Sequence, residues 1–161
     1  MSNTQSMCTS FLGELMQAYH NFGTAPTRGA STADTFKAAL YLTTGSVDAS
    51  TTAYTATGEV TSTNYTAGGV TVTNANPPTS TNSSATAGVG YWTPSASIVY
   101  GSSGTPVTFA SFNAVLIYNS TQSNRAVSVH TFTAQTVTSG TFTLTMPSNT
   151  TSTALLRLAT T

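Results

Sequence analysis

Hydrophobic and polar residues alternate with a period of two along most of the chain after residue 35, the pattern of half-buried β-strands. The pattern is clearest at 141–146, where every second residue is hydrophobic and the residues between them are threonine. In the first such segment, 36–43, the hydrophobic residues that share one face are Phe36, Ala38, Leu40 and Leu42. Ala39 and Tyr41 lie on the other face of that segment, and in 126–133 both faces hold some apolar groups.

Turn signals separate these segments every 8–12 residues or so, which is typical of an all-β sandwich. The predicted strands are 36–43, 58–62, 70–73, 90–92, 97–100, 107–109, 113–119, 126–133, 141–146 and 154–158. Their unequal lengths favour a β-sandwich of jelly-roll type over a closed barrel. The Gly68-Gly69 pair predicts a tight turn.

The one helical pattern lies near the N-terminus, where hydrophobic residues recur at helical spacing. These residues are Phe11, Leu12, Leu15, Met16 and Tyr19. We predict a helix over 10–22, preceded by a flexible arm over 1–9. About three turns is marginal for a free helix, so its stripe must dock on the sheet or on a neighbouring subunit. With a sandwich over 35–161, the chain forms a single domain, 1–161.

The stretch 74–87 is polar and contains Pro77-Pro78, which predicts a long exposed loop. Loops of this length in a compact domain are usually functional or mobile. We therefore expect this loop to be a second element that reaches toward a partner.

The low charge content narrows the range of functions that the sequence allows. Only four Lys+Arg and four Asp+Glu occur, so 5% of the residues are charged, and about a fifth are threonine. A net charge of zero produces no long-range repulsion between copies, which favours self-association. The chain has no basic patch for nucleic acid, no polybasic segment for a membrane surface and no apolar run long enough to span a bilayer.

Candidate catalytic groups are few. The bases are His20 and His130, each of which we interpret as structural. Asp34 and Asp48 are expected to cap turns, and Glu59 to pair with Lys37 or Arg125. The single cysteine, Cys8, is expected to be an inert, partly buried thiol.

No His/Cys cluster has metal-ligand spacing, no acidic loop resembles a calcium site, and no glycine pair resembles a phosphate loop. We therefore expect neither an enzyme nor a cofactor. The aromatic residues allow two interpretations, a hydrophobic core or a sugar-binding platform around Tyr91-Trp92. A sugar-binding platform would need carboxylates or amides beside the rings, and carboxylates are missing here. The hydrophobic core is therefore the favoured interpretation.

Three stretches carry a resemblance. They are TFKAALYLTTGSVDASTTAYTATGEVTSTNYTAGG at 35–69, AVLIYNSTQSNRAVSV at 114–129, and SGTFTLTMPSNTTSTALLRLA near the C-terminus. They resemble a family of small virion proteins of tailed bacteriophages, whose members carry a helix similar to FLGELMQAYHNFG. The most specific segments are YTATGEV…YTAGG and LIYN. The chain departs from the family pattern in a longer 93–111 segment and in the His130-Thr131-Phe132 sequence.

The resemblance implies a capsid cement or decoration protein, bound to the major capsid protein on the outer surface of a phage head, with other copies as a dimer or trimer. The alternative is a tail, neck or fibre component that attaches to a protein shaft or touches a host glycan. The family has no catalytic residues to transfer. The residues expected at the interface are Phe11, Leu12, Leu15, Met16, Tyr19, Pro77 and Pro78.

Overall fold

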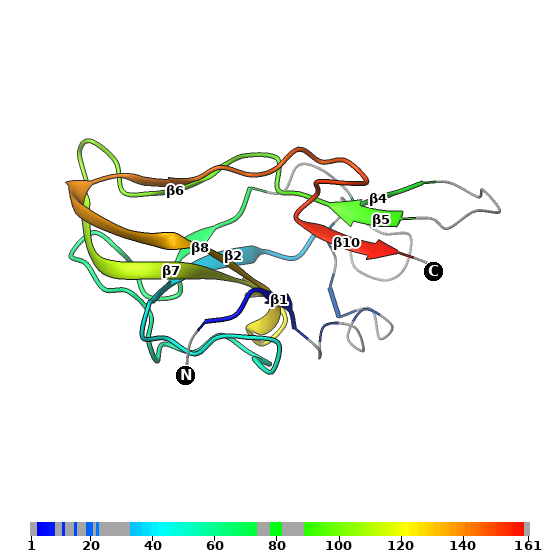
Figure 1. Ribbon diagram of the computed structural model, residues 1–161, viewed down its shortest axis with the longest axis horizontal. Helices are drawn as coiled ribbons and strands as arrows, with labels where there is room; N and C mark the ends of the chain where they lie inside the picture. The colour runs from blue at the N-terminus through cyan, green and yellow to red at the C-terminus, as the bar shows by residue number, and fades with distance from the viewer. Residues whose placement is uncertain are drawn as a thin grey trace.

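The structure is a computed structural model that describes residues 3–8, 11, 15, 19–20, 22, 33–73, 78–81 and 89–159. Its regular elements are β-strands, which confirms the all-β prediction (Figure 1). The strands are β1 (Ser6–Met7), β2 (Phe36–Leu42), β3 (Val70–Thr71), β4 (Thr79–Ser80), β5 (Val89–Trp92), β6 (Ile98–Tyr100), β7 (Val107–Asn119), β8 (Arg125–Gly140), β9 (Phe142–Leu144) and β10 (Leu156–Ala159).

The largest sheet has five strands in the order β1-β8-β7-β2-β3, and every pair in it is antiparallel. The hairpin of β7 and β8 forms its centre, and Figure 1 shows this hairpin alongside β2. The connecting turn, 120–124, includes Ser123 and Asn124 with positive φ angles of 54° and 58°. Asparagine tolerates this left-handed conformation better than most residues, which suits it to the turn.

Strand β2 is buried on both faces. Ala38, Ala39, Leu40 and Tyr41 are all 0% exposed. The outer edge of β2 is paired with β3 and bridged between Tyr41 and Glu59. The chain segments that cover the second face come from distant positions, so alternation within one strand cannot indicate them.

A two-stranded sheet, β6-β9, lies over the β7–β8 hairpin (Figure 1). Phe142 of β9 packs against Phe112 of β7 at 4.8 Å and Phe132 of β8 at 5.6 Å between ring centroids. Tyr100 of β6 is 6.0 Å from Phe142 and donates a hydrogen bond to Ala38 O at 3.2 Å. These aromatic contacts join the small sheet to the large one.

Bulges explain why β7 and β8 are longer than predicted. The segments 107–109 and 113–119 are one continuous strand, and β8 continues beyond residue 133 to Gly140. The pairing register between β7 and β8 shifts at three places between Val107 and Ala114. A bulge leaves a residue unpaired without ending the ladder, so polar positions that read as strand ends lie inside the strands.

Two other predictions are corrected. The expected strand at 58–62 is a single bridge between Glu59 and Tyr41, because β3 takes the rest of the β2 edge. The expected loop at 74–87 contains β4, which pairs with β5 through Thr79 and Ser80. Residues 74–77 and 82–87 of that loop lie outside the described residues.

Residues 3–8, expected in a flexible arm, are bonded to the large sheet. Ser6 pairs with Val129, and Cys8 is fully buried, rather than partly buried as expected. The Asn3 amide donates to Leu42 O at 2.9 Å and to Asn113 Oδ1 at 2.7 Å. These bonds fasten the segment across two strands. Most of the predicted helix, 10–22, lies outside the described residues.

Candidate functional site

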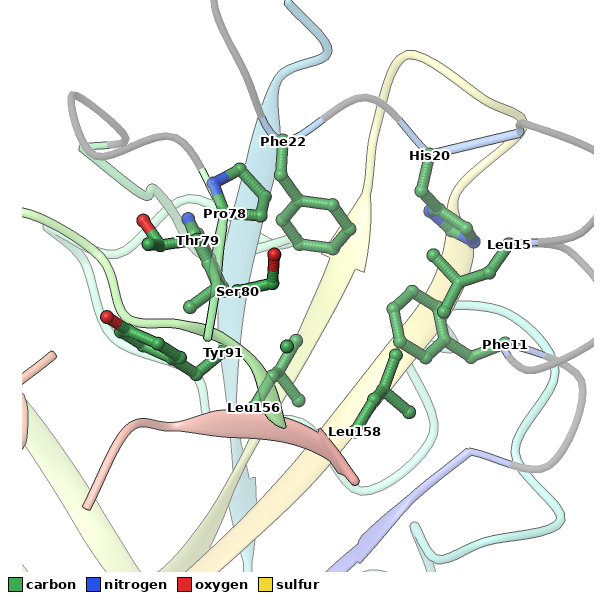
Figure 2. A pocket seen from close by; sticks show the side chains of 12 residues that line it. Phe11, Leu15, His20, Phe22, Pro78, Thr79, Ser80, Tyr91, Leu156 and Leu158 are labelled. Atoms are coloured by element: carbon green, nitrogen blue, oxygen red, sulfur yellow. The ribbon is translucent and has the colours of Figure 1, made fainter. Parts of the chain in front are cut away.

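Interface residues expected from the sequence meet at one pocket, which has a volume of about 490 Å³. Phe11 and Leu15 line it from the N-terminal segment, and Pro78 lines it from the start of β4 (Figure 2). Leu12, Met16 and Pro77 lie outside the described residues. The pocket therefore brings together residues that are far apart in the chain.

The floor of the pocket is one face of the three-stranded sheet β10-β5-β4. Leu156 lies opposite Trp92, and Gly90 lies opposite Leu158 on one side and Ser80 on the other. Residues directly opposite each other in an antiparallel pair point to the same face, so these five residues form one surface. In Figure 2, Leu156 and Leu158 point from β10 into the pocket.

Four described residues of the N-terminal part, Phe11, Leu15, His20 and Phe22, line the opposite wall of the pocket, and aromatic contacts attach Phe22 to the core. Phe22 packs against Trp92 at 4.7 Å and against Phe36 of β2 at 4.4 Å between ring centroids. Phe11 contacts His20 at 4.9 Å. Phe22 thus connects this wall to β2. The pocket lies between the wall and the sheet β10-β5-β4.

Tyr19 lies outside the pocket. Its side chain is 37% exposed, and the Arg125 guanidinium lies 4.2 Å from the centroid of its ring. This cation–π contact holds the ring against the start of β8. Tyr19 thus provides exposed aromatic surface at the sheet rather than at the pocket.

A second cluster surrounds the carboxylate of Glu59, which is only 6% exposed. Its Oε2 accepts a hydrogen bond from Tyr54 at 2.6 Å, and its Oε1 accepts bonds from Tyr65 at 2.5 Å and the Gly68 N–H at 2.8 Å. Glu59 therefore accepts hydrogen bonds from two tyrosines and a backbone amide. The expected pairing with Lys37 or Arg125 is wrong. Three donors facing one acceptor-only group satisfy a buried carboxylate.

The surrounding tyrosines are themselves tied to backbone carbonyls. Tyr41 donates to Thr55 O at 2.5 Å, and Tyr118 donates to Gly68 O at 2.7 Å. Burial, reinforced by the negative charge of Glu59, raises the pKa of the Tyr65, Tyr100 and Tyr118 hydroxyls. The phenols stay protonated and act as hydrogen-bond donors, so the cluster clamps the segment 54–68 onto the sheet.

Sequence reasoning missed this cluster, although its signal is present in the segment YTATGEV…YTAGG. Tyr54, Glu59 and Tyr65 come from that segment, and Gly68 and Gly69 end it. Its role became visible only when the fold brought Tyr118 and β2 against it. Because the carboxylate is buried and fully hydrogen-bonded, the arrangement suits stabilisation rather than reaction with a substrate.

Each histidine has a hydrogen-bonded or buried position. The His20 ring nitrogen Nδ1 lies 3.2 Å from the Asn119 amide nitrogen. The His130 Nε2 lies 2.9 Å from the Ser128 hydroxyl, and burial lowers the pKa of His130 to about 4. His20 lines the pocket, whereas His130 lies on β8 and is not among the lining residues, so the two do not form one site.

The depressed pKa of His130 predicts an acid-sensitive fold. Between about pH 6.5 and pH 4 the unfolded chain binds a proton that the folded chain does not, so stability falls as pH drops through that window. From pH 7.5 to 4.5, urea unfolding should show the wild type losing about 1–2 kcal/mol more than His130→Gln. Parallel pH profiles for the two proteins would contradict this.

The aromatic residues form a core, as the favoured interpretation predicts. Trp92 is 2% exposed, and Tyr100, Phe109, Phe112 and Tyr118 are each 2% exposed or less. A sugar platform needs exposed ring faces, and these rings are covered. Tyr91, beside Trp92, is half-buried at the pocket.

The described residues thus define an all-β protein with an apolar pocket and a buried carboxylate–tyrosine cluster. Among them, no group of three His, Cys, Asp or Glu is placed to hold a metal ion, and no helix is long and apolar enough to cross a membrane. No protein-family model, curated protein or solved structure matches the chain significantly.

Proposed function

We propose that this protein is a capsid cement or decoration protein that binds the major capsid protein lattice on the outside of a phage head. The observation that carries the proposal is the convergence of Phe11, Leu15 and Pro78 on one apolar pocket. These residues were expected at the interface from sequence, and the fold gathers them at a single place. The low charge of the chain and its resemblance to phage virion proteins support the same function.

On this proposal the fold is a β-sandwich of jelly-roll type, in which the β6-β9 sheet forms part of a second layer over the five-stranded sheet. The ring contacts of Phe142 with Phe112 and Phe132 support two facing layers. Such a rigid scaffold would hold the pocket in a constant position relative to the capsid.

The proposed mechanism is multivalent burial rather than catalysis. Each contact is weak, and many copies bound to a regular lattice, as dimers or trimers on its symmetry axes, hold the array firmly. The buried Glu59 and the half-buried His130 fit this mechanism, because they leave few ionisable groups at the surface for chemistry.

An apolar, hydroxyl-rich contact should be insensitive to ionic strength. We expect the occupancy of purified protein on stripped heads to change less than about twofold between low and high salt, since screening acts on charged pairs. The measurement is sedimentation of heads with bound protein across a salt series. Release by moderate salt would indicate a charge-paired contact and contradict the proposed mechanism.

Imaging of intact particles tests the placement. Hundreds of copies over the head are expected for a cement protein, whereas a few to a dozen copies at one vertex would indicate a tail or neck component. A chain that occurs in no viral particle would refute both.

A further inference from the structure

Gly90 leaves a gap in the floor of the pocket. It lies in the middle of β5, and its cross-strand neighbours Leu158 and Ser80 both line the pocket. A side chain at position 90 would point to the same face as these two neighbours. The gap therefore lies in the centre of the pocket floor.

Within the described part of the chain, neither the backbone nor the packing requires glycine at this position. Gly90 has no positive φ, unlike Gly58, Gly68, Gly69 and Gly101. Among the described residues, the nearest atom to a Cβ built on Gly90 is Leu158 O, at 3.9 Å, an ordinary contact. A glycine weakens a strand and often marks a place where a ligand approaches closely.

We propose that the pocket is a binding site for one bulky apolar side chain of the capsid protein, and that Gly90 keeps the room for it. This inference rests on the proposed function and names the chemistry of the contact. Leucine and phenylalanine side chains fit the requirement, since burial of either removes a large apolar area from water. The volume of about 490 Å³ is within the range of ligand pockets and holds the side chain with its flanking backbone.

The lining selects against charged groups. None of its described residues is Lys, Arg, Asp or Glu, so an ionic side chain would exchange its hydration for at most a few polar neighbours, such as His20, Thr79 and Ser80. Phe11 and Leu15 provide apolar contacts from the wall, and Leu156 and Leu158 provide them from the floor. An uncharged, apolar group is therefore the favoured occupant.

Filling the gap separates binding from folding. Gly90→Phe should occupy the pocket and lower head occupancy roughly tenfold or more, because the partner side chain loses its place. Gly90→Val is a smaller filling variant in case the phenylalanine disturbs β5. Gly104→Phe is the matched control, since no described atom lies within 4 Å of a Cβ at that exposed position. It should bind heads as the wild type does.

A second measurement needs no phage particle. Trp92, the only tryptophan, lines the pocket, so its fluorescence reports occupancy directly. We expect N-acetyl-leucinamide and N-acetyl-phenylalaninamide to change the emission saturably, with a dissociation constant of roughly millimolar. N-acetyl-lysinamide should have no effect. The change should persist in Gly104→Phe and disappear in Gly90→Phe.

The outcomes distinguish the two proposals. If wild-type protein does not bind heads, the decoration function fails, and the Trp92 titration alone decides whether the pocket binds an apolar side chain. If wild type and folded Gly90→Phe bind heads equally well, the pocket proposal fails and the decoration function stands. No saturable change of Trp92 emission with either apolar probe also overturns the pocket proposal.

Discussion

Gly69→Ala is expected to destabilise the protein by more than about 4 kcal/mol, enough to unfold most domains of this size. Gly69 has a φ of 74°, which costs an alanine about 1–2 kcal/mol. Its added Cβ would also overlap Ala38 O and lie 2.8 Å from Ala39 Cα. Both are backbone atoms of the buried strand β2, so the clash cannot be relieved by turning a side chain.

Guanidinium unfolding of Gly69→Ala and Gly104→Ala tests this expectation. Gly104 has no described atom within 4 Å of a built Cβ and no positive φ, so its substitution should change stability by less than about 0.5 kcal/mol. Similar midpoints for the two variants would show that the turn does not lie against β2 as described.

Glu59→Ala is expected to cost about 3–5 kcal/mol. The substitution leaves the hydroxyls of Tyr54 and Tyr65 and the Gly68 N–H without their acceptor in a buried place, at about 1–3 kcal/mol for each group. Part of this penalty is recovered if water enters the cavity. The hydrogen bond that holds the Gly68-Gly69 turn, from the Gly68 N–H to the Glu59 carboxylate, is lost in either case.

Glu59→Gln separates the hydrogen bonds from the charge. The amide oxygen still accepts from Tyr65 and Gly68, and the amide NH₂ can donate to Tyr54, whose hydroxyl then turns to accept. We expect a loss of about 1–2 kcal/mol in urea unfolding, less than half of that for alanine. Asp48→Ala, which removes a carboxylate bonded to Ser50 in a surface turn, should have a much smaller effect. Equal losses for Glu59→Gln and Glu59→Ala would contradict the hydrogen-bond account.

The sequence predicted the all-β class because alternation and turn residues are local signals that survive in almost any tertiary context. The strands Phe36–Leu42 and Phe142–Leu144 are examples, since alternation predicted both of them. The same local signals placed false ends in β7 and β8, since a bulge and a strand end both appear as a break in alternation.

Composition and alternation along the chain were sufficient to indicate a strand-rich protein with few charged residues, and the expected interface residues included three that line the pocket, Phe11, Leu15 and Pro78. The sequence did not predict how those residues are arranged in space. The pocket exists because β10 pairs with β5, which is far from it in the sequence (Leu156 lies opposite Trp92), and Glu59 is buried because β2 and Tyr118 pack against its segment. Which distant strands pair depends on the free energy of burial and hydrogen bonding summed over the whole fold. A short window of neighbouring residues carries only a small part of that free energy.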